Sequence, residues 1–304
     1  MLGVTADYDD ELALLVDNAA EAGLAWSGPP AVERRTLELR GGGQLGALVW
    51  GAGPPEAVLV HGSAQNAHTW DTVALALGRP LVAVDLPGHG RSSWREDRDY
   101  SPAVLAGTLV EAIEALAPAA RLVVGMSLGG LACIRVAATR PDLVASLVLV
   151  DITPGVRASG TAEIAAMVSG PPSFGSLEEI VDWTVRHNPG RSVAALRRGV
   201  LHNSRQLSDG SWVWRWDPAG RSLPGRDRVE RPHAGLWDDL ARTAMPLTLV
   251  RGASSPVVDD EDVVELSVRR PDALVVSVEG AGHSVQGDRP LELASLLEAR
   301  LQAG

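Results

Sequence analysis

The sequence predicts an α/β protein with a mostly parallel sheet flanked by helices. Three observations favour this class: short apolar runs recur along the chain, amphipathic helical segments separate them, and the runs end in loops rich in glycine and polar residues. A strand that is apolar throughout is typical of a parallel sheet with both faces covered. In such a sheet, the loops at the carboxyl ends of the strands carry function.

The composition supports one large core and excludes several classes of protein. The chain has 304 residues, of which 45% are hydrophobic, a formal net charge of −11 and no lysine. It contains no basic stripe, so we expect no nucleic-acid partner. The single cysteine, Cys133, excludes an internal disulfide and is expected to pack as a small hydrophobic residue.

Neither a targeting signal nor a membrane span is evident. Residues 1–10 are acidic and lack the order of a signal peptide, and no apolar run approaches the roughly 20 residues needed to cross a bilayer. We therefore expect a cytoplasmic protein without a membrane partner.

The period of the apolar residues assigns the elements in order. Helical spacing from Leu12 to Ala19 predicts a short first helix, and alternation on either side of Gly41–Gly43 predicts an antiparallel hairpin. The continuous apolar runs that predict parallel strands are residues 57–60, 81–85, 122–126, 147–151, 246–250 and 273–278. The main helices are expected over residues 101–116, after Ser127, from about residue 260 and from Pro290.

The alternation stops after Gly155, and about 80 residues follow without a clear strand. An insertion at the carboxyl end of a strand lies over the site of a parallel sheet. We therefore expect residues 154–235 to form an inserted helical cap domain, and residues 1–153 and 236–304 to form the core domain.

A strand, a tight turn and a helix are predicted around Ser127, in Gly125-Met126-Ser127-Leu128-Gly129. A turn this sharp strains the serine backbone and brings neighbouring chain close, so glycines are needed on both sides. The hydroxyl is then exposed at the end of the strand. The Leu128 N–H, at the start of the helix, can stabilise an anion that forms on a bound carbonyl.

Four motifs together resemble those of the α/β-hydrolase family with a cap domain. They are His61-Gly62-Ser63, Asp85-x-Pro-Gly-His89-Gly-x-Ser92, Gly125-x-Ser127-x-Gly129-Gly130 and Gly280-Ala281-Gly282-His283. The resemblance covers nearly the whole chain outside the expected cap. It implies an α/β-hydrolase fold and a serine hydrolase that needs no cofactor.

The resemblance also implies roles for these residues. Ser127 is the nucleophile and His283 is the base that activates it, because an alcohol is a poor nucleophile at neutral pH. The oxyanion hole is formed by the N–H groups of Leu128 and Ser63, with Ala64 a less favoured donor than Ser63. The loop histidines His61 and His89 are structural. The other histidines, His68, His187, His202 and His233, lack metal-ligand spacing, so no metal site is expected.

The acid of the triad is where this chain departs from the commonest family pattern. Many relatives carry it as Gly-x-x-Asp after the strand that follows the cap, but this chain has Gly252-Ala253-Ser254-Ser255 there. Some branches carry the acid directly after the strand before the cap, and Asp151 lies at that position. Asp259 and Asp260 are alternatives that more simply cap a helix. Asp151 could also be a structural carboxylate that holds the entry of the cap.

Tryptophans are the remaining candidates for substrate contact. Trp70 follows the oxyanion loop, and Trp183 and Trp214 lie in the expected cap. The rings of Trp212, Trp214 and Trp216 alternate, so they share one face of an extended segment. They either pack the interior of the cap or line an apolar substrate wall.

These features predict a hydrolase of small or medium-sized apolar esters or lactones. A carbon–carbon bond hydrolase of the same fold, which uses the same Ser and His, is the enzymatic alternative. A ligand-binding receptor without turnover is the alternative from another class, since the fold alone does not decide function.

Overall fold

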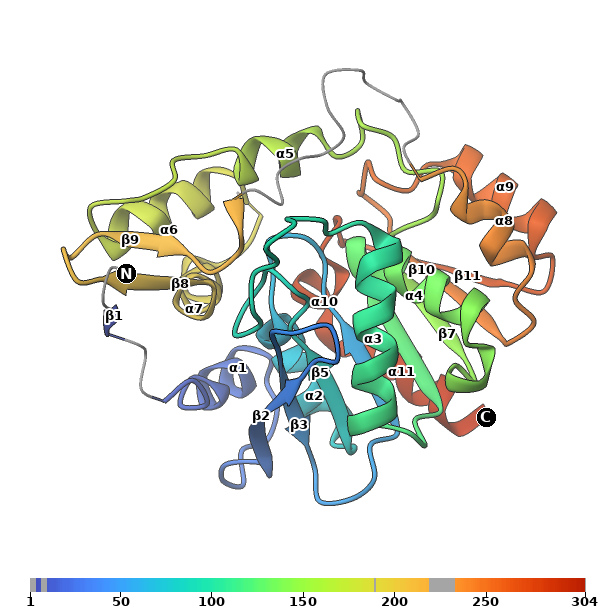
Figure 1. The fold of residues 1–304 in the computed structure, drawn as a ribbon, viewed down its shortest axis with the longest axis horizontal. Helices are drawn as coiled ribbons and strands as arrows, with labels where there is room; N and C mark the ends of the chain where they lie inside the picture. Colours follow the sequence, from blue (N-terminus) through green and yellow to red (C-terminus); the bar gives the residue numbers. More distant parts are fainter. Residues whose placement is uncertain (1–3, 7–9, 189, 219–232, 304) are drawn as a thin grey trace.

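The computed structural model describes residues 4–6, 10–188, 190–218 and 233–303. Its largest element is an eight-stranded sheet covered by helices on both faces (Figure 1). The strands follow the order β11 (Leu274–Val278), β10 (Leu247–Gly252), β7 (Leu147–Val150), β6 (Leu122–Met126), β4 (Ala57–Val60), β5 (Leu81–Val84), β3 (Gln44–Trp50) and β2 (Val32–Glu38).

Strands β4, β5, β6, β7, β10 and β11 pair in parallel, and β2 and β3 form the predicted antiparallel hairpin at one edge. The prediction of an α/β fold with a mostly parallel sheet is therefore confirmed. Because the carboxyl ends of parallel strands meet at one edge, the loops after β6, β7, β10 and β11 lie side by side.

Successive side chains of the buried strands point to opposite faces of the sheet, so they pack into two separate hydrophobic cores. In β4, Val58 and Val60 belong to one cluster, whereas Ala57 and Leu59 belong to the other. The first cluster is covered by α3 (Pro102–Leu116), α4 (Leu128–Thr139), α8 (Leu236–Ala241) and α9 (Asp260–Arg269). The second is covered by α1 (Leu15–Glu21), α2 (Asp71–Leu77), α10 (Val285–Asp288) and α11 (Pro290–Ala303). Cys133 is fully buried in the first cluster, as expected.

The segment between β7 and α8 contains α5 (Ala162–Val168), α6 (Leu177–Arg186) and α7 (Val193–Asn203), followed by β8 (Ser204–Leu207) and β9 (Trp212–Trp214). Figure 1 shows it at one end of the sheet, with α7 near α1 and with α8 and α9 on the opposite side. Its helices were predicted, but its strands were not. A third hydrophobic cluster, built mainly from this segment, contains Phe174, Ile180, Val181, Val200, Trp214 and Trp216, together with Ala64.

The short strand β1 (Val4–Ala6) pairs antiparallel with β8, so a second sheet has the order β1-β8-β9. β1 lies in the range expected for the core domain, yet it joins the sheet of the inserted segment. The 3-10 helices η1 (Ala67–Trp70) and η2 (Pro141–Leu143) complete the described elements.

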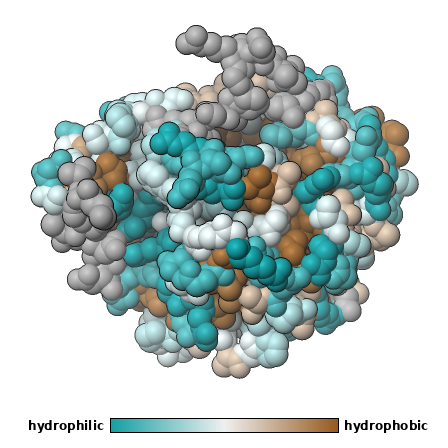
Figure 2. Space-filling model, viewed as in Figure 1, coloured by the Kyte–Doolittle hydropathy of each residue, from teal (hydrophilic) through white to brown (hydrophobic). Residues whose placement is uncertain are grey.

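The surface of the face seen in Figure 1 is mixed. Figure 2 shows hydrophobic side chains there as separate patches among hydrophilic ones. None of the helices in the described ranges is long and apolar enough to cross a membrane.

Candidate active site

The turn at Ser127 has the predicted strand-turn-helix geometry. β6 ends at Met126, Ser127 has φ 50° and ψ −123°, and α4 begins at Leu128. A serine rarely adopts a positive φ, so the surrounding structure must hold this strained conformation. A Cβ at Gly129 would lie 2.4 Å from the carbonyl oxygen of His61, and one at Gly125 would lie 2.6 Å from Gly130 Cα. The glycines are therefore needed because backbone passes on both sides of the turn.

Asp151 and His283 are hydrogen-bonded to each other. The distance from His283 Nδ1 to Asp151 Oδ2 is 2.7 Å, and the Asp151 side chain has no exposed surface. Asp151 is the first residue after β7 and has φ 50°, and its Oδ1 accepts the Gly252 N–H at 2.8 Å. A carboxylate accepts hydrogen bonds only, so it holds the imidazole with the proton on Nδ1.

Ser255 is a residue of this site that sequence reasoning did not assign. Its hydroxyl donates to Asp151 Oδ2, and its Oγ accepts the Val257 N–H at 3.1 Å. The serine thus lies beside the carboxylate that comes from the neighbouring strand. The only sequence signal was its place in the loop where many relatives carry the acid.

The alternative acids lie elsewhere. Asp259 caps α9 and accepts the Asp262 N–H at 2.9 Å. The Asp260 side chain is almost fully exposed and pairs with Arg251 at 2.7 Å. Both residues therefore behave as the helix-start carboxylates that the sequence suggested as their simpler role.

The loop after β4 passes directly against the nucleophile turn. A Cβ at Gly62 would lie 2.5 Å from Met126 Sδ and 2.9 Å from Ser127 Cβ. Ser63 is exposed in this loop, and the next residue, Ala64, has φ 58°. The loop is thus positioned as an oxyanion loop requires, while the donor role of the Ser63 and Leu128 N–H groups stays a prediction.

His61 has the hydrogen bonds of a buried structural residue. Its Nε2 accepts the Leu86 N–H at 2.9 Å, and its Nδ1–H donates to the Gly62 carbonyl at 2.7 Å. Burial, and then the neighbouring His89, lower the pKa of His61 to about 3, so the ring is neutral. Both ring nitrogens are occupied, which leaves His61 unsuited to act as the base.

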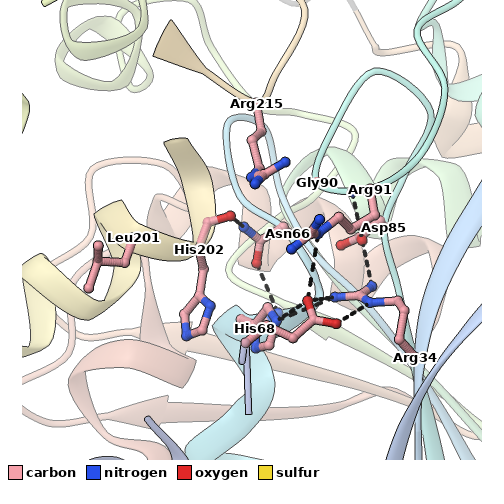
Figure 3. Close-up of a pocket in the computed structure, with 10 residues that line it drawn as sticks. Arg34, Asn66, His68, Asp85, Gly90, Arg91, Leu201, His202 and Arg215 are labelled. Carbon is pink, nitrogen blue, oxygen red and sulfur yellow. Dashed lines mark hydrogen bonds and ion pairs between the residues drawn. The ribbon is translucent and has the colours of Figure 1, made fainter. Parts of the chain in front are cut away.

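Asp85, the first residue after β5, lies beside Arg34 and Arg91 and anchors the loop after β4 (Figure 3). It is fully buried and accepts hydrogen bonds from Arg34 Nη1 at 2.8 Å, from the Ala67 N–H at 2.7 Å and from the Arg91 N–H at 3.0 Å. Burial alone would raise the pKa of Asp85, but the Arg34 guanidinium and the backbone N–H donors of Ala67 and Arg91 together outweigh burial and lower it. The carboxylate therefore stays charged and fixes both loops.

A pair of asparagines joins the inserted segment to the same loop. Asn66 Nδ2 donates to Asn203 Oδ1 at 2.8 Å and to the His202 carbonyl at 3.0 Å, and Asn203 Nδ2 donates to the Ala64 carbonyl at 2.7 Å. We call these contacts the asparagine clasp. Since Ala64 has a positive φ, the clasp holds a strained peptide of the candidate oxyanion loop from the side of the inserted segment.

His68 lies between two carboxylates at this junction. Its Nδ1 is 2.9 Å from Asp71 Oδ2, and its Nε2 is 3.1 Å from Glu11 Oε2. Burial alone would lower the pKa of His68, but these carboxylates, Asp71 first, raise it to about 9. Its ring stacks on that of His202, with centroids 3.7 Å apart and planes 7° apart.

Ligand atoms of His68, Asp71 and His202 lie within 4.8 Å of one another, so in the described ranges this group could hold a metal ion. Sequence spacing did not reveal it, because the three residues come from separate elements. Both nitrogens of His68 already face carboxylates, and two stacked rings do not direct their in-plane lone pairs at one point. The charges therefore account for the cluster as an ion-pair network.

The structure corrects one tryptophan prediction. Trp70 has no exposed surface and packs in the second hydrophobic cluster of the sheet, so it does not form an open substrate wall. Trp70 is the last residue of η1, whose start is capped by the Asn66 side chain through the His68 N–H. Trp183 is half-buried, and its Nε1 donates to the Met167 carbonyl at 3.2 Å.

Trp214 is buried and stacks on Trp216, with ring centroids 4.1 Å apart. The predicted shared face of this extended segment is thus confirmed for the two rings. Both rings belong to the third hydrophobic cluster, and both also line a cavity.

Comparison with known proteins agrees with this geometry. Residues 57–296 match the model of the alpha/beta hydrolase family. The esterase Rv0045c of Mycobacterium tuberculosis is 48% identical over 300 residues, which are 96% of this chain and 96% of that protein. The lipase LipV of the same bacterium is 29% identical over 264 residues, which are 82% of this chain and 94% of that protein. A crystal structure of Rv0045c has a TM-score of 0.82 at 44% identity, covering 98% of this chain and 100% of that one. The chain therefore belongs to the alpha/beta hydrolase family.

Proposed function

We propose that this hydrolase cleaves small or medium-sized apolar carboxylic esters or lactones, with Ser127, His283 and Asp151 as its catalytic triad. The observation that carries the proposal is the 2.7 Å hydrogen bond from His283 Nδ1 to the buried Asp151 carboxylate, in loops beside that of the strained Ser127. The esterase and lipase among its relatives support ester cleavage over the carbon–carbon hydrolase or the receptor.

The first half of the reaction forms an acyl-enzyme. Ser127 Oγ bonds to the ester carbonyl carbon while its proton passes to His283 Nε2, and the carbonyl oxygen becomes an anion near the N–H groups of Leu128 and Ser63. Asp151 stabilises the imidazolium that results. The bond from carbon to the alcohol oxygen then breaks, and the leaving alcohol takes the proton from Nε2.

The second half returns the enzyme to its starting state. Water loses a proton to His283 Nε2 and bonds to the acyl carbon, the bond to Ser127 Oγ breaks, and the serine regains the proton. The acid is released. Ser255, by donating to Asp151, would hold the carboxylate in position throughout.

The inserted segment would act as a cap over this site. The asparagine clasp supports this role, because it joins α7 to the loop that passes Ser127. The domain limits of residues 154–235 for the cap, with 1–153 and 236–304 for the core, belong to the same proposal.

Labelling with a fluorophosphonate probe tests the nucleophile. Wild-type protein should be labelled and should hydrolyse short-chain aryl esters, whereas Ser127→Ala should lose labelling and about 10⁴-fold or more in turnover. Ser295→Ala is a matched control, because its exposed hydroxyl on α11 only donates to the Leu291 carbonyl. Labelling that persists in Ser127→Ala would refute the assignment.

A further inference from the structure

The loop after β4 makes a tight turn over residues 62–65, and the Gln65 side chain helps to close it. The Gln65 N–H donates to the Gly62 carbonyl at 3.3 Å, and the Gly62 N–H donates back to Gln65 Oε1 at 3.2 Å. The two central residues are Ser63, which is exposed, and Ala64, which has φ 58°. A positive φ is uncommon for alanine, so the surrounding contacts must hold this turn.

The same side chain also reaches the loop that carries His283. Gln65 Nε2 lies 3.4 Å from Ser284 Oγ and donates to it, and Ser284 directly follows His283. An amide suits this place because it offers one oxygen that accepts from the turn and one nitrogen that donates to the neighbouring loop. Gln65 therefore contacts the loops of both the candidate oxyanion hole and the candidate base.

A second glutamine, Gln286 of α10, supports Gln65 from the interior. Gln286 is 1% exposed, and its Nε2 donates to Gln65 Oε1 at 3.4 Å and to Thr69 Oγ1 at 3.3 Å. Its Oε1 is buried and has no hydrogen-bond partner within the described ranges. A buried polar atom without a partner costs stability, whereas an apolar side chain of similar size avoids that cost. Stability alone therefore does not account for an amide at this position.

The geometry points to Gln65 as a positioning residue, which holds the Ser63 N–H in place relative to His283. This inference rests on the proposed function, in which the Ser63 N–H stabilises the oxyanion and His283 carries the proton. The three side-chain contacts of Gln65 are 3.2 to 3.4 Å long, and hydrogen bonds in unliganded active sites often tighten when substrate binds. Because the carbonyl oxygen becomes an anion only as the reaction proceeds, the position of its donor affects kcat more than KM.

Steady-state hydrolysis of a short-chain aryl ester tests this role in Gln65→Met, which keeps the length of the side chain but loses its hydrogen bonds. We expect kcat to fall about 10- to 100-fold, the order of loss that follows from a misplaced donor or reacting group. KM should change less than about threefold. Butylboronic acid forms a tetrahedral anion when its boron bonds to Ser127 Oγ and the serine proton passes to His283. Its inhibition constant should rise in parallel with the fall in kcat.

Two further variants separate positioning from folding. Ser284→Ala should lower kcat several-fold in the wild-type background and have no further effect beside Gln65→Met, because both changes remove the same contact. Gln286→Met should also lower kcat several-fold. Its midpoint of thermal unfolding should stay the same or rise, because the buried oxygen without a partner is removed.

Gln302→Met is the matched control, since Gln302 is exposed on α11 and donates only to Glu298, so its kcat should equal that of wild type. A Gln65→Met protein with normal kcat and normal boronic acid affinity would overturn the inference and leave the triad in place. If that variant does not fold, wild-type kcat in both Ser284→Ala and Gln286→Met would overturn it equally. A wild-type protein that resists fluorophosphonate labelling would instead refute the proposed function itself.

Discussion

The sheet of the core and the inserted segment are held by different forces. The central strands of the core are apolar on both faces, and its turns are fixed by glycines at backbone contacts, as at Gly125 and Gly129. The inserted segment has a small aromatic cluster, and it joins the core through the asparagine clasp and the stacking of His202 on His68. Apolar burial thus builds the scaffold that presents Ser127, whereas polar contacts join the inserted segment to the loop beside it.

The comparison predicts that the largest effects on rate arise at the ends of the core strands. Asp151→Asn keeps the shape of the site but favours the wrong imidazole tautomer of His283, so kcat should fall by about 10⁴-fold. The midpoint of thermal unfolding should shift far less than the activity. Asp259→Asn is the control, because its carboxylate caps a helix and should cost little in rate. A near-normal kcat in Asp151→Asn would show that another residue orients His283.

Stability at alkaline pH should depend on the charged junction. The pKa of His68 is about 9 in the folded protein against 6.5 for an unperturbed histidine. The raised pKa contributes stability that is fully present below pH 6.5 and is lost as the pH rises through 9, up to about 3 kcal/mol. Denaturant unfolding at pH 6 and at pH 10 should show this loss, and His68→Gln should flatten it. His187→Gln should keep the wild-type difference. An equal loss of unfolding free energy between pH 6 and pH 10 in all three proteins would show that His68 does not cause the pH dependence.

The serine beside the acid offers a smaller test within the core. Ser255→Ala removes the hydrogen bond to Asp151, and one such bond to a charged group is worth about 1.5–3 kcal/mol, so kcat should fall about 10- to 100-fold. Ser255→Thr, which keeps the hydroxyl, should restore kcat. A purely structural serine would lower the midpoint of thermal unfolding in Ser255→Ala without lowering kcat.

The smallest effect is expected where the two regions meet. Asn203→Ala removes the donor to the Ala64 carbonyl and should lower kcat several-fold, about 1 kcal/mol, with little change in KM for acetate esters. Asn188→Ala is the matched control, since Asn188 Nδ2 donates only within the inserted segment, to the Thr184 carbonyl and toward Met167 Sδ. Equal kcat values for the two variants would mean that the clasp does not position the loop.

Sequence reasoning succeeded where local chemistry decides the structure. Apolar runs such as residues 57–60 predicted the parallel strands, because a strand that is buried on both faces needs apolar residues at every position. Asp151 was also accessible, since its position directly after a strand restricts where the carboxylate can lie. Its hydrogen bond to His283 is the contact that the sequence predicted.

The misses share a different cause. β8 is the short polar run Ser204–Leu207 and β1 has three residues, so neither carries a clear hydrophobic pattern. Trp70 was misplaced because it packs in the second hydrophobic cluster with residues from distant segments, a contact that its place after the candidate oxyanion loop does not show. The role of Ser255 could be assigned only from its hydrogen bond to Asp151, which lies 104 positions earlier in the chain. Contacts between segments that are distant in sequence depend on the whole fold, so they cannot be predicted from the local residue pattern.

The pairing of β1 with β8 also has a consequence for the order of folding. Val4 lies opposite Leu207, so this pairing joins the start of the described chain to a point about two-thirds of the way along it. Contacts between residues so far apart form late, because a long loop must close first. During synthesis from the amino terminus, β1 emerges early but has no partner until β8 is made. We therefore expect β1 to pair with β8 late in folding, after the strand pairs of the core sheet whose members are close in sequence.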